Sequence, residues 1–111
     1  MREMADHTSR IGVFGGSFDP IHNAHLAMAE AALDQAQLDR VLFVVSAHPP
    51  HKIGGPYATA EERFTMVEAA LTNCPHMEAS RLEIDRPGPS YTVDTLRRLR
   101  ALDPHAELFF I

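Results

Sequence analysis

The sequence alternates short apolar runs with longer segments of helix-forming residues, and this alternation constrains the fold more than any other feature. Val41–Val45 is apolar without a polar–apolar alternation, as expected of a strand covered on both faces. Strands that alternate with helices predict an α/β fold with a mostly parallel sheet and right-handed crossovers. The expected order is β-α-β-α-β-α-β, with strands at 10–14, 41–45, 77–84 and 107–111 and helices at 22–36, 59–72 and 92–102.

Each expected helix carries one apolar stripe at helical spacing. Thr59 and Glu62 have the spacing of a capping box and mark the start of the second helix. Four phenylalanines fit core positions of the strands and of the second helix: Phe43, Phe64, Phe109 and Phe110. The stripes are Leu26, Ala29, Leu33 and Ala36 in the first helix, Phe64, Val67 and Leu71 in the second, and Val93, Leu96 and Leu99 in the third.

Length and composition indicate one soluble domain. The chain has 111 residues, of which 45% are apolar and 23% charged. A net charge of −5 argues against a nucleic-acid binder, and no apolar run reaches the roughly 18 residues of a membrane span. The single cysteine, Cys74, cannot form an internal disulfide and favours a cytoplasmic protein. Residues 1–9 are polar and predict a flexible leader, which leaves 10–111 as the domain.

The segment that carries most chemistry is GGSFDPIHNAH, at the first expected strand-to-helix junction. Gly15 and Gly16 allow the backbone to approach a phosphate closely, and the helix start offers unpaired N–H groups. His22 and His25 are three residues apart and therefore share one face of the first helical turn. The segment has neither the dinucleotide-binding nor the Walker pattern. A tight turn with two surface histidines is the alternative interpretation.

GGSFDPIHNAH resembles the nucleotidyltransferase signature in which a glycine-rich loop leads to His-x-Gly-His, although Ala24 replaces the glycine. PPHK at 49–52, RFTM at 63–66 and GPSYTVDTL at 88–96 follow in the same order. Together these segments resemble bacterial nicotinate-nucleotide adenylyltransferase, and the resemblance spans residues 11–111. It implies a Rossmann-like nucleotidyltransferase fold. It also implies transfer of the adenylyl group of ATP to nicotinate mononucleotide, which gives nicotinate adenine dinucleotide and pyrophosphate in NAD biosynthesis.

The resemblance implies roles for the first motif. The backbone around Gly15, Gly16, Ser17 and Phe18 would bind ATP. His22 and His25 would contact its phosphates as the catalytic residues and stabilise charge at the attacked centre. Mg²⁺ would arrive with the nucleotide, and no protein metal site is expected.

The later motifs imply the second substrate site. Lys52 would contact a phosphate, and Ser90, Tyr91 and Thr92 would hold the nicotinate nucleotide. The plainer interpretations are a solvated surface lysine, a packing role for Tyr91 and a helix N-cap for Thr92. Arg63 ranks below Lys52, because a surface role fits its place in a helix.

Two other interpretations concern single residue types. His22, His25, His48 and His51 form two His-x-x-His pairs, and four imidazoles could hold zinc if the loops converged, but no other ligand set supports this. Cys74 precedes a proline and is expected to be an inert buried thiol.

The end of the chain favours an incomplete domain. Glu107–Ile111 is an apolar strand with no turn or polar tail after it, and the resemblance implies further C-terminal motifs that contact ATP. We therefore expect the N-terminal portion of an adenylyltransferase, apparently truncated at its C-terminus. The alternatives are a non-catalytic nucleotide- or partner-binding fragment and a phosphopantetheine-type adenylyltransferase. The sequence leaves a homo-oligomer open and does not decide between the acid and amide mononucleotides.

Overall fold

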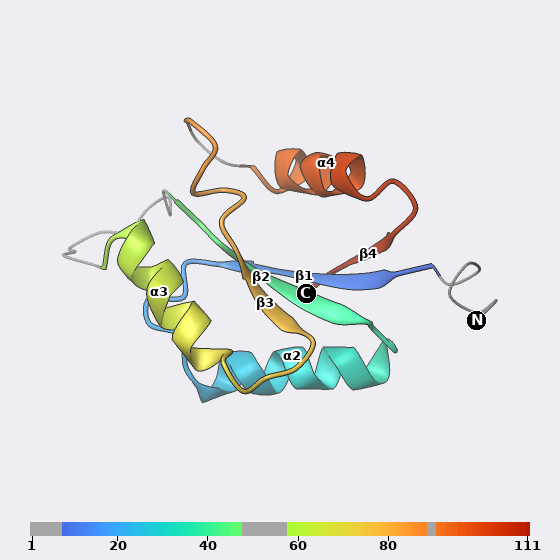
Figure 1. Ribbon diagram of the computed structural model, residues 1–111, viewed down its shortest axis with the longest axis horizontal. Coiled ribbons are helices and arrows are strands. Elements are labelled where there is room, and N and C mark those ends of the chain that lie inside the picture. The colour runs from blue at the N-terminus through green and yellow to red at the C-terminus, as the bar shows by residue number, and fades with distance from the viewer. Residues whose placement is uncertain (1–7, 48–57, 89–90) are drawn as a thin grey trace.

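A parallel sheet with helices on both faces forms the molecule (Figure 1). The computed structural model describes residues 8–47, 58–88 and 91–111, and within them four strands lie in the order β3-β2-β1-β4. All three strand pairs are parallel, so the expected fold class, sheet type and element order are confirmed. The elements are β1 (Arg10–Gly16), α2 (Asn23–Gln35), β2 (Arg40–Val45), α3 (Ala60–Ala70), β3 (Met77–Ser80), α4 (Thr92–Leu102) and β4 (Glu107–Phe110).

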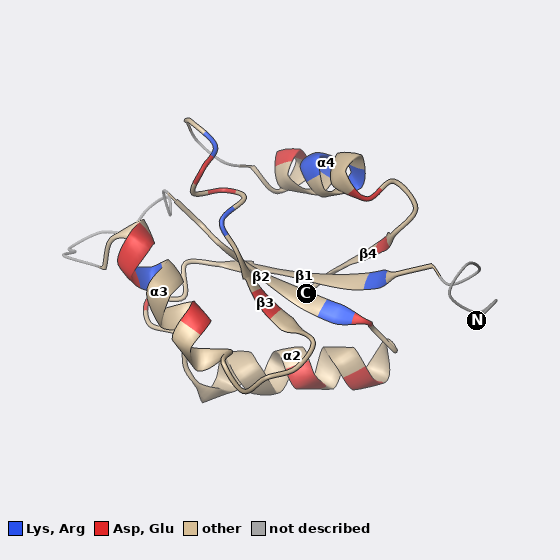
Figure 2. Ribbon diagram, viewed as in Figure 1, with Lys and Arg blue, Asp and Glu red and all other residues tan. Residues whose placement is uncertain are grey.

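The two faces of the sheet have separate cores. Helices α2 and α3 cover one face, where Phe14 and Phe43 pack with Ala29 and Val67. Helix α4 covers the other face. There Leu99 packs with the side chains of β1 and β2 that point away from α2 and α3. The helices also differ in charge, because α4 carries three arginines whereas α2 carries only acidic charges (Figure 2). The apolar strand β2 is buried on both sides, as its sequence predicts.

Strand β1 lies at the topological switch point of the sheet. It pairs with β2 on one side and with β4 on the other. The crossovers through α2 and α3 use one face, and the crossover through α4 uses the other (Figure 1). In open α/β sheets, ligands bind outside the carboxyl ends of the strands at such a point. The segment after β1 is therefore where the fold favours a binding site.

The helix limits agree with the sequence pattern to within two residues. Thr59 is the N-cap of helix α3. Its Oγ1 accepts the Glu62 N–H at 3.1 Å, while the Thr59 N–H donates to Glu62 Oε1 at 2.8 Å. The predicted capping box is thus confirmed. Helix α4 has the expected limits, but its N-cap is Tyr91, without a side-chain bond, so the N-cap interpretation of Thr92 is wrong.

Two strands differ in length from the expectation by two residues or more, whereas β2 begins and β4 ends one residue earlier than expected. β1 continues through Gly15 and Gly16, which pair with Val44 and Val45. β3 ends at Ser80, not at residue 84, because the chain turns there. The Ser80 Oγ accepts the Leu82 N–H at 3.2 Å, and the Asp85 N–H donates to the Arg81 carbonyl at 2.9 Å.

The inward side of α4 also differs from the expectation. Val93 is 52% exposed, whereas Thr95 is 3% exposed. The Thr95 hydroxyl donates to Glu83 Oε2 at 2.6 Å and accepts from Arg86 Nη2 at 3.0 Å, so the turn after β3 orients the helix. Phe110, expected in the core, is 63% exposed because β4 is an edge strand of the sheet as described.

We expect Thr59→Ala to lower the free energy of unfolding by about 1 kcal/mol, because the first turn of α3 loses a side-chain cap. Urea denaturation followed by circular dichroism measures this change. Thr65→Ala is the matched control, since Thr65 is exposed in the middle of the same helix and bonds only the Glu61 carbonyl in its own helix. Equal losses in the two variants would contradict the capping role.

Candidate functional site

A pocket of about 500 Å³ lies at the carboxyl end of β1. The segment between β1 and α2 and the first turn of α2 form its wall. The six residues expected to bind ATP all line it, and Phe14, Asp19 and Pro20 line it as well although the sequence analysis gave them no such role. The full lining is Phe14, Gly15, Gly16, Ser17, Phe18, Asp19, Pro20, His22 and His25.

Phe18 anchors the loop in the core. It is 3% exposed, and its ring lies 5.4 Å from the Phe14 ring and 5.5 Å from the Phe43 ring, measured between centroids. Its φ of 51° is in the left-handed region, which is rare for a bulky residue. A Cβ on Gly16 would lie 3.3 Å from Phe18 Cζ, so the absence of a side chain there makes room for the ring. The tight turn is therefore held by packing behind it.

His22 and His25 stack at the start of α2. Their ring centroids are 4.1 Å apart. His22 Nδ1 accepts the Ala24 N–H at 3.3 Å, and His25 Nδ1 accepts the His22 N–H at 3.1 Å, so an imidazole pair forms the capping box. Because Nδ1 of each ring accepts, each neutral imidazole carries its proton on Nε2. The pair can therefore donate two N–H groups to an anion at the helix N-terminus.

The pKa of His25 is below its ordinary value of 6.5, first because burial disfavours the charged imidazole and second because His22 repels it. His25 also packs edge-on against the Phe18 ring, with centroids 5.1 Å apart. At neutral pH this geometry favours an uncharged imidazole that donates from Nε2.

Arg63 is buried directly behind the loop, although it was expected to be a surface residue. It is 2% exposed. Its Nη1 donates to the Ser17 carbonyl at 2.9 Å and to the Ser46 carbonyl at 2.7 Å, and its Nε donates to the Ala58 carbonyl at 3.1 Å. The pKa of the Arg63 guanidinium is below its ordinary value, because burial lowers it more than the nearby charge of Asp19 raises it. The surface interpretation of Arg63 is wrong, because carbonyls from the segments after β1 and β2 accept its N–H groups and hold it in the interior beside Phe64 and Val67.

Two polar atoms near this guanidinium are buried without a hydrogen-bond partner within the described part of the chain. They are Asp19 Oδ2 and Ser46 Oγ. Asp19 belongs to the pocket wall, and the Ser46 carbonyl binds Arg63. Buried polar groups without a partner are uncommon in folded proteins, and a catalytic role or a bound water or ion is a usual reason for them. The carboxyl ends of β1 and β2 thus share one polar cluster.

Of the remaining expected site residues, only Tyr91 and Thr92 are among the described residues, and neither lies in this pocket. Lys52, Ser90 and the second histidine pair, His48 and His51, lie outside the described residues. Tyr91 is 61% exposed and Thr92 opens α4, and neither lines the pocket. Cys74 is half-buried, and its Sγ donates to the Ala70 carbonyl at 3.6 Å.

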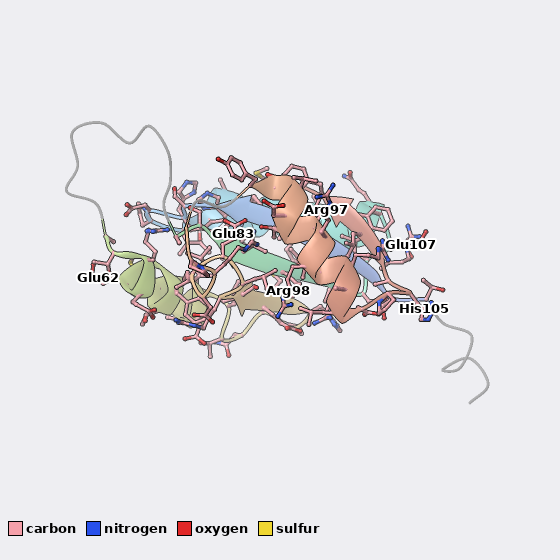
Figure 3. All side chains as sticks on the ribbon, turned by 90° about the horizontal axis from the view of Figure 1, so that it is seen from above. Glu62, Glu83, Arg97, Arg98, His105 and Glu107 are labelled. Carbon is pink, nitrogen blue, oxygen red and sulfur yellow. The ribbon has the colours of Figure 1, made fainter. Side chains whose placement is uncertain are left out.

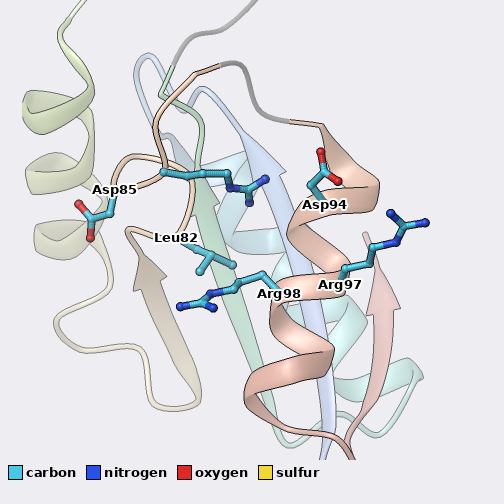
Figure 4. Close-up of a pocket in the computed structure, with 6 residues that line it drawn as sticks. Leu82, Asp85, Asp94, Arg97 and Arg98 are labelled. Atoms are coloured by element: carbon cyan, nitrogen blue, oxygen red, sulfur yellow. The ribbon is translucent and has the colours of Figure 1, made fainter.

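A second pocket, of about 640 Å³, lies between α4 and the turn after β3 (Figure 4). It is lined by Leu82, Asp85, Arg86, Asp94, Arg97 and Arg98. Arg97 and Arg98 project from different sides of α4, as both Figure 3 and Figure 4 show. Because these guanidinium groups do not converge, the larger volume does not make a coherent anion site. The β1 pocket is the better candidate.

Neither a cluster of metal-ligating side chains nor a membrane-spanning helix is found in residues 8–47, 58–88 and 91–111. There, no group of three or more His, Cys, Asp or Glu side chains could hold a metal ion. None of the helices in those ranges has the length and apolar character needed to cross a bilayer.

The cytidylyltransferase-like family model matches residues 13–110, which include the whole pocket. The chain belongs to this family. The nucleotidyltransferase assignment made from the motifs is therefore confirmed, and the pocket lies in the part of the chain that carries the family pattern.

The names of curated relatives are more specific than the description of the family model. A probable nicotinate-nucleotide adenylyltransferase of Thermus thermophilus is 61% identical over 102 residues, which are 92% of this chain and 54% of the relative. One from Thermomicrobium roseum is 48% identical over 93% of this chain and 48% of its own length. The chain thus spans about half the length of the curated relatives it matches.

Comparison with solved structures agrees with the fold described above. Plasmodium falciparum nicotinic acid mononucleotide adenylyltransferase complexed with NaAD superposes with a TM-score of 0.78 at 21% identity, covering 92% of this chain and 50% of that one. At this identity the likeness shows the shared Rossmann-like fold.

We expect His22→Asn to raise the pKa of His25 only part of the way toward 6.5, because burial, the larger cause, remains. NMR titration of the His25 imidazole measures it. The pKa of His25 is lower in the folded chain than in the unfolded chain, so as the pH falls below 6.5 the unfolded chain binds a proton at His25 first. The free energy of unfolding therefore decreases as the pH falls below 6.5, and this contribution is retained above pH 6.5. A His25 pKa at or above 6.5 in the unmodified chain would contradict the described surroundings.

Proposed function

We propose that the protein transfers the adenylyl group of ATP to nicotinate mononucleotide, releasing pyrophosphate, and that this chain supplies the glycine-rich loop and the histidine pair that bind the ATP phosphates. One observation carries the proposal: eight of the eleven motif residues from Gly15 to His25 line one pocket at the switch point of the sheet. The names of the relatives support the choice of substrates.

The chemistry is a displacement at the α-phosphorus of ATP. A phosphate oxygen of the mononucleotide attacks, a new P–O bond forms, and the bond to the β-phosphate oxygen breaks, so that pyrophosphate leaves with the electron pair. His22 and His25 donate from Nε2 to phosphate oxygens and stabilise their growing charge. The glycine backbone and the N-terminus of α2 bind the phosphates. The protein contributes position and charge, without a covalent intermediate.

Mg²⁺ enters this scheme as part of the nucleotide substrate. It keeps several waters and binds mainly through phosphates and one or two carboxylates. The pocket wall offers one carboxylate, Asp19, which fits a metal carried by ATP better than a resident one.

The mononucleotide site remains an expectation around Lys52 and residues 90–92. Helix α4 begins at the same edge of the sheet as the pocket (Figure 1), which supports a contribution from Tyr91 and Thr92. A cytoplasmic location is proposed with the reaction, since the chain has a single cysteine.

The activity test uses a chimera in which this chain replaces the matching 102 residues of the Thermus thermophilus relative, because the chain spans about half of that protein. Incubated with MgATP and nicotinate mononucleotide, the chimera should release pyrophosphate and nicotinate adenine dinucleotide in equal amounts, as chromatography measures. A folded chimera that binds ATP without product would instead favour a non-catalytic nucleotide-binding role. Product with phosphopantetheine alone would favour that sister activity.

In the same chimera, His22→Ala should lower kcat by roughly 10²–10³-fold with little change in KM for ATP, because donors to developing charge act mainly in the transition state. His105→Ala is the matched control, since His105 is exposed in the turn before β4 (Figure 3). An unchanged kcat in His22→Ala would remove the catalytic role of this residue.

A further inference from the structure

The buried guanidinium of Arg63 connects three separate segments at the carboxyl edge of the sheet. It binds Ser17 in the loop after β1, Ser46 and Ala47 after β2, and Ala58 just before α3. We propose that Arg63 is a positioning residue that fixes the loop between β1 and α2 in the arrangement that binds a nucleoside triphosphate. This inference rests on the proposed function for the identity of the ligand.

The bond to Ser17 determines how the loop presents its backbone. In a trans peptide the C=O and the following N–H point in opposite directions. The Ser17 carbonyl accepts from Arg63 Nη1 at 2.9 Å, so the Phe18 N–H is directed away from the guanidinium. The bond to the Ser46 carbonyl has the same effect on the Ala47 N–H. Arg63 thus sets the direction of two donors at the carboxyl edge.

Only an arginine can make this set of bonds. Its planar guanidinium has five N–H donors in a fixed geometry, whereas a lysine has three donors on one nitrogen. Four carbonyls accept from Arg63, at distances between 2.7 and 3.4 Å. Arg63→Lys keeps the positive charge near Asp19 but leaves some of these buried carbonyls unpaired.

The NMR signal of His25 depends on where the loop between β1 and α2 lies. Phe18 follows Ser17 directly, and its ring lies 5.1 Å from the His25 ring. A proton near an aromatic ring has a chemical shift that depends strongly on the ring's place. The His25 Hε1 signal therefore measures loop geometry independently of ATP and of overall stability.

The test compares three variants of the chain itself. Arg63→Lys should raise the Kd for ATP about tenfold, as expected when charge-assisted contacts in the loop are lost, and should move the His25 Hε1 signal. Val67→Ala is the matched control: Val67 is 0% exposed on the same helix, so this variant loses stability without losing a bond to the loop. Arg81→Lys controls for the replacement of a guanidinium by an ammonium group away from the loop, since Arg81 forms an exposed ion pair with Glu61.

Both controls should keep the Kd for ATP and the His25 signal of the unmodified chain. If Arg63→Lys also keeps both, the positioning role is overturned. If Val67→Ala weakens ATP binding as much as Arg63→Lys does, Arg63 acts only through stability and the proposal again fails.

Two further outcomes, absence of ATP binding and failure of the variant to fold, can be distinguished from each other. If the unmodified chain does not bind ATP, the Kd comparison is made in the chimera, and absence of ATP binding there contradicts the proposed function. The His25 signal of Arg63→Lys alone then decides whether Arg63 positions the loop. If Arg63→Lys does not fold, the Arg63 Nε–Hε signal of the unmodified chain serves instead: it should shift when ATP binds, and a signal unmoved at saturation would overturn the proposal.

Discussion

The central place of β1 in a parallel sheet is the constraint on which the rest of the structure depends. Right-handed crossovers that run in opposite directions along a sheet lie on opposite faces. Helices α2 and α3, which lead from β1 to β2 and β3, therefore lie on one face, and α4, which leads back past β1 to β4, lies on the other (Figure 1). The chain leaving β1 therefore emerges at a point that the described strands and helices do not cover. The segment from Gly15 to Pro20 lines a pocket open to a ligand, while the side chain of Phe18 in the same segment is buried.

A buried charge holds this edge in place. The carbonyls at the ends of β1 and β2 lie where the sheet no longer pairs them, and Arg63 satisfies them from the inner side of α3. Asp19 balances part of the charge. The same side of α3 that builds the core with Phe64 and Val67 thus also supports the site, so packing and binding are linked through one helix.

Much of the fold and of the pocket could be predicted from local pattern. The capping box at Thr59 and the motif from Gly15 to His25 act through neighbouring residues, and both lie as expected. The errors involve contacts distant in sequence. Arg63 is polar by composition and buried by tertiary bonds, and Thr95 replaces Val93 on the inner side of α4 because Glu83 and Arg86 bind its hydroxyl. No periodicity in a single helix contains that information.

The most direct test of the account is the location of ATP on the ¹⁵N-labelled chain, mapped by amide chemical shifts during a titration. The account predicts that the largest changes fall on Gly15, Gly16, Ser17 and Phe18 and on the first turn of α2. Changes confined to the turn after β3 and to α4, around Arg86 and Arg98, would contradict it and place the nucleotide in the second pocket.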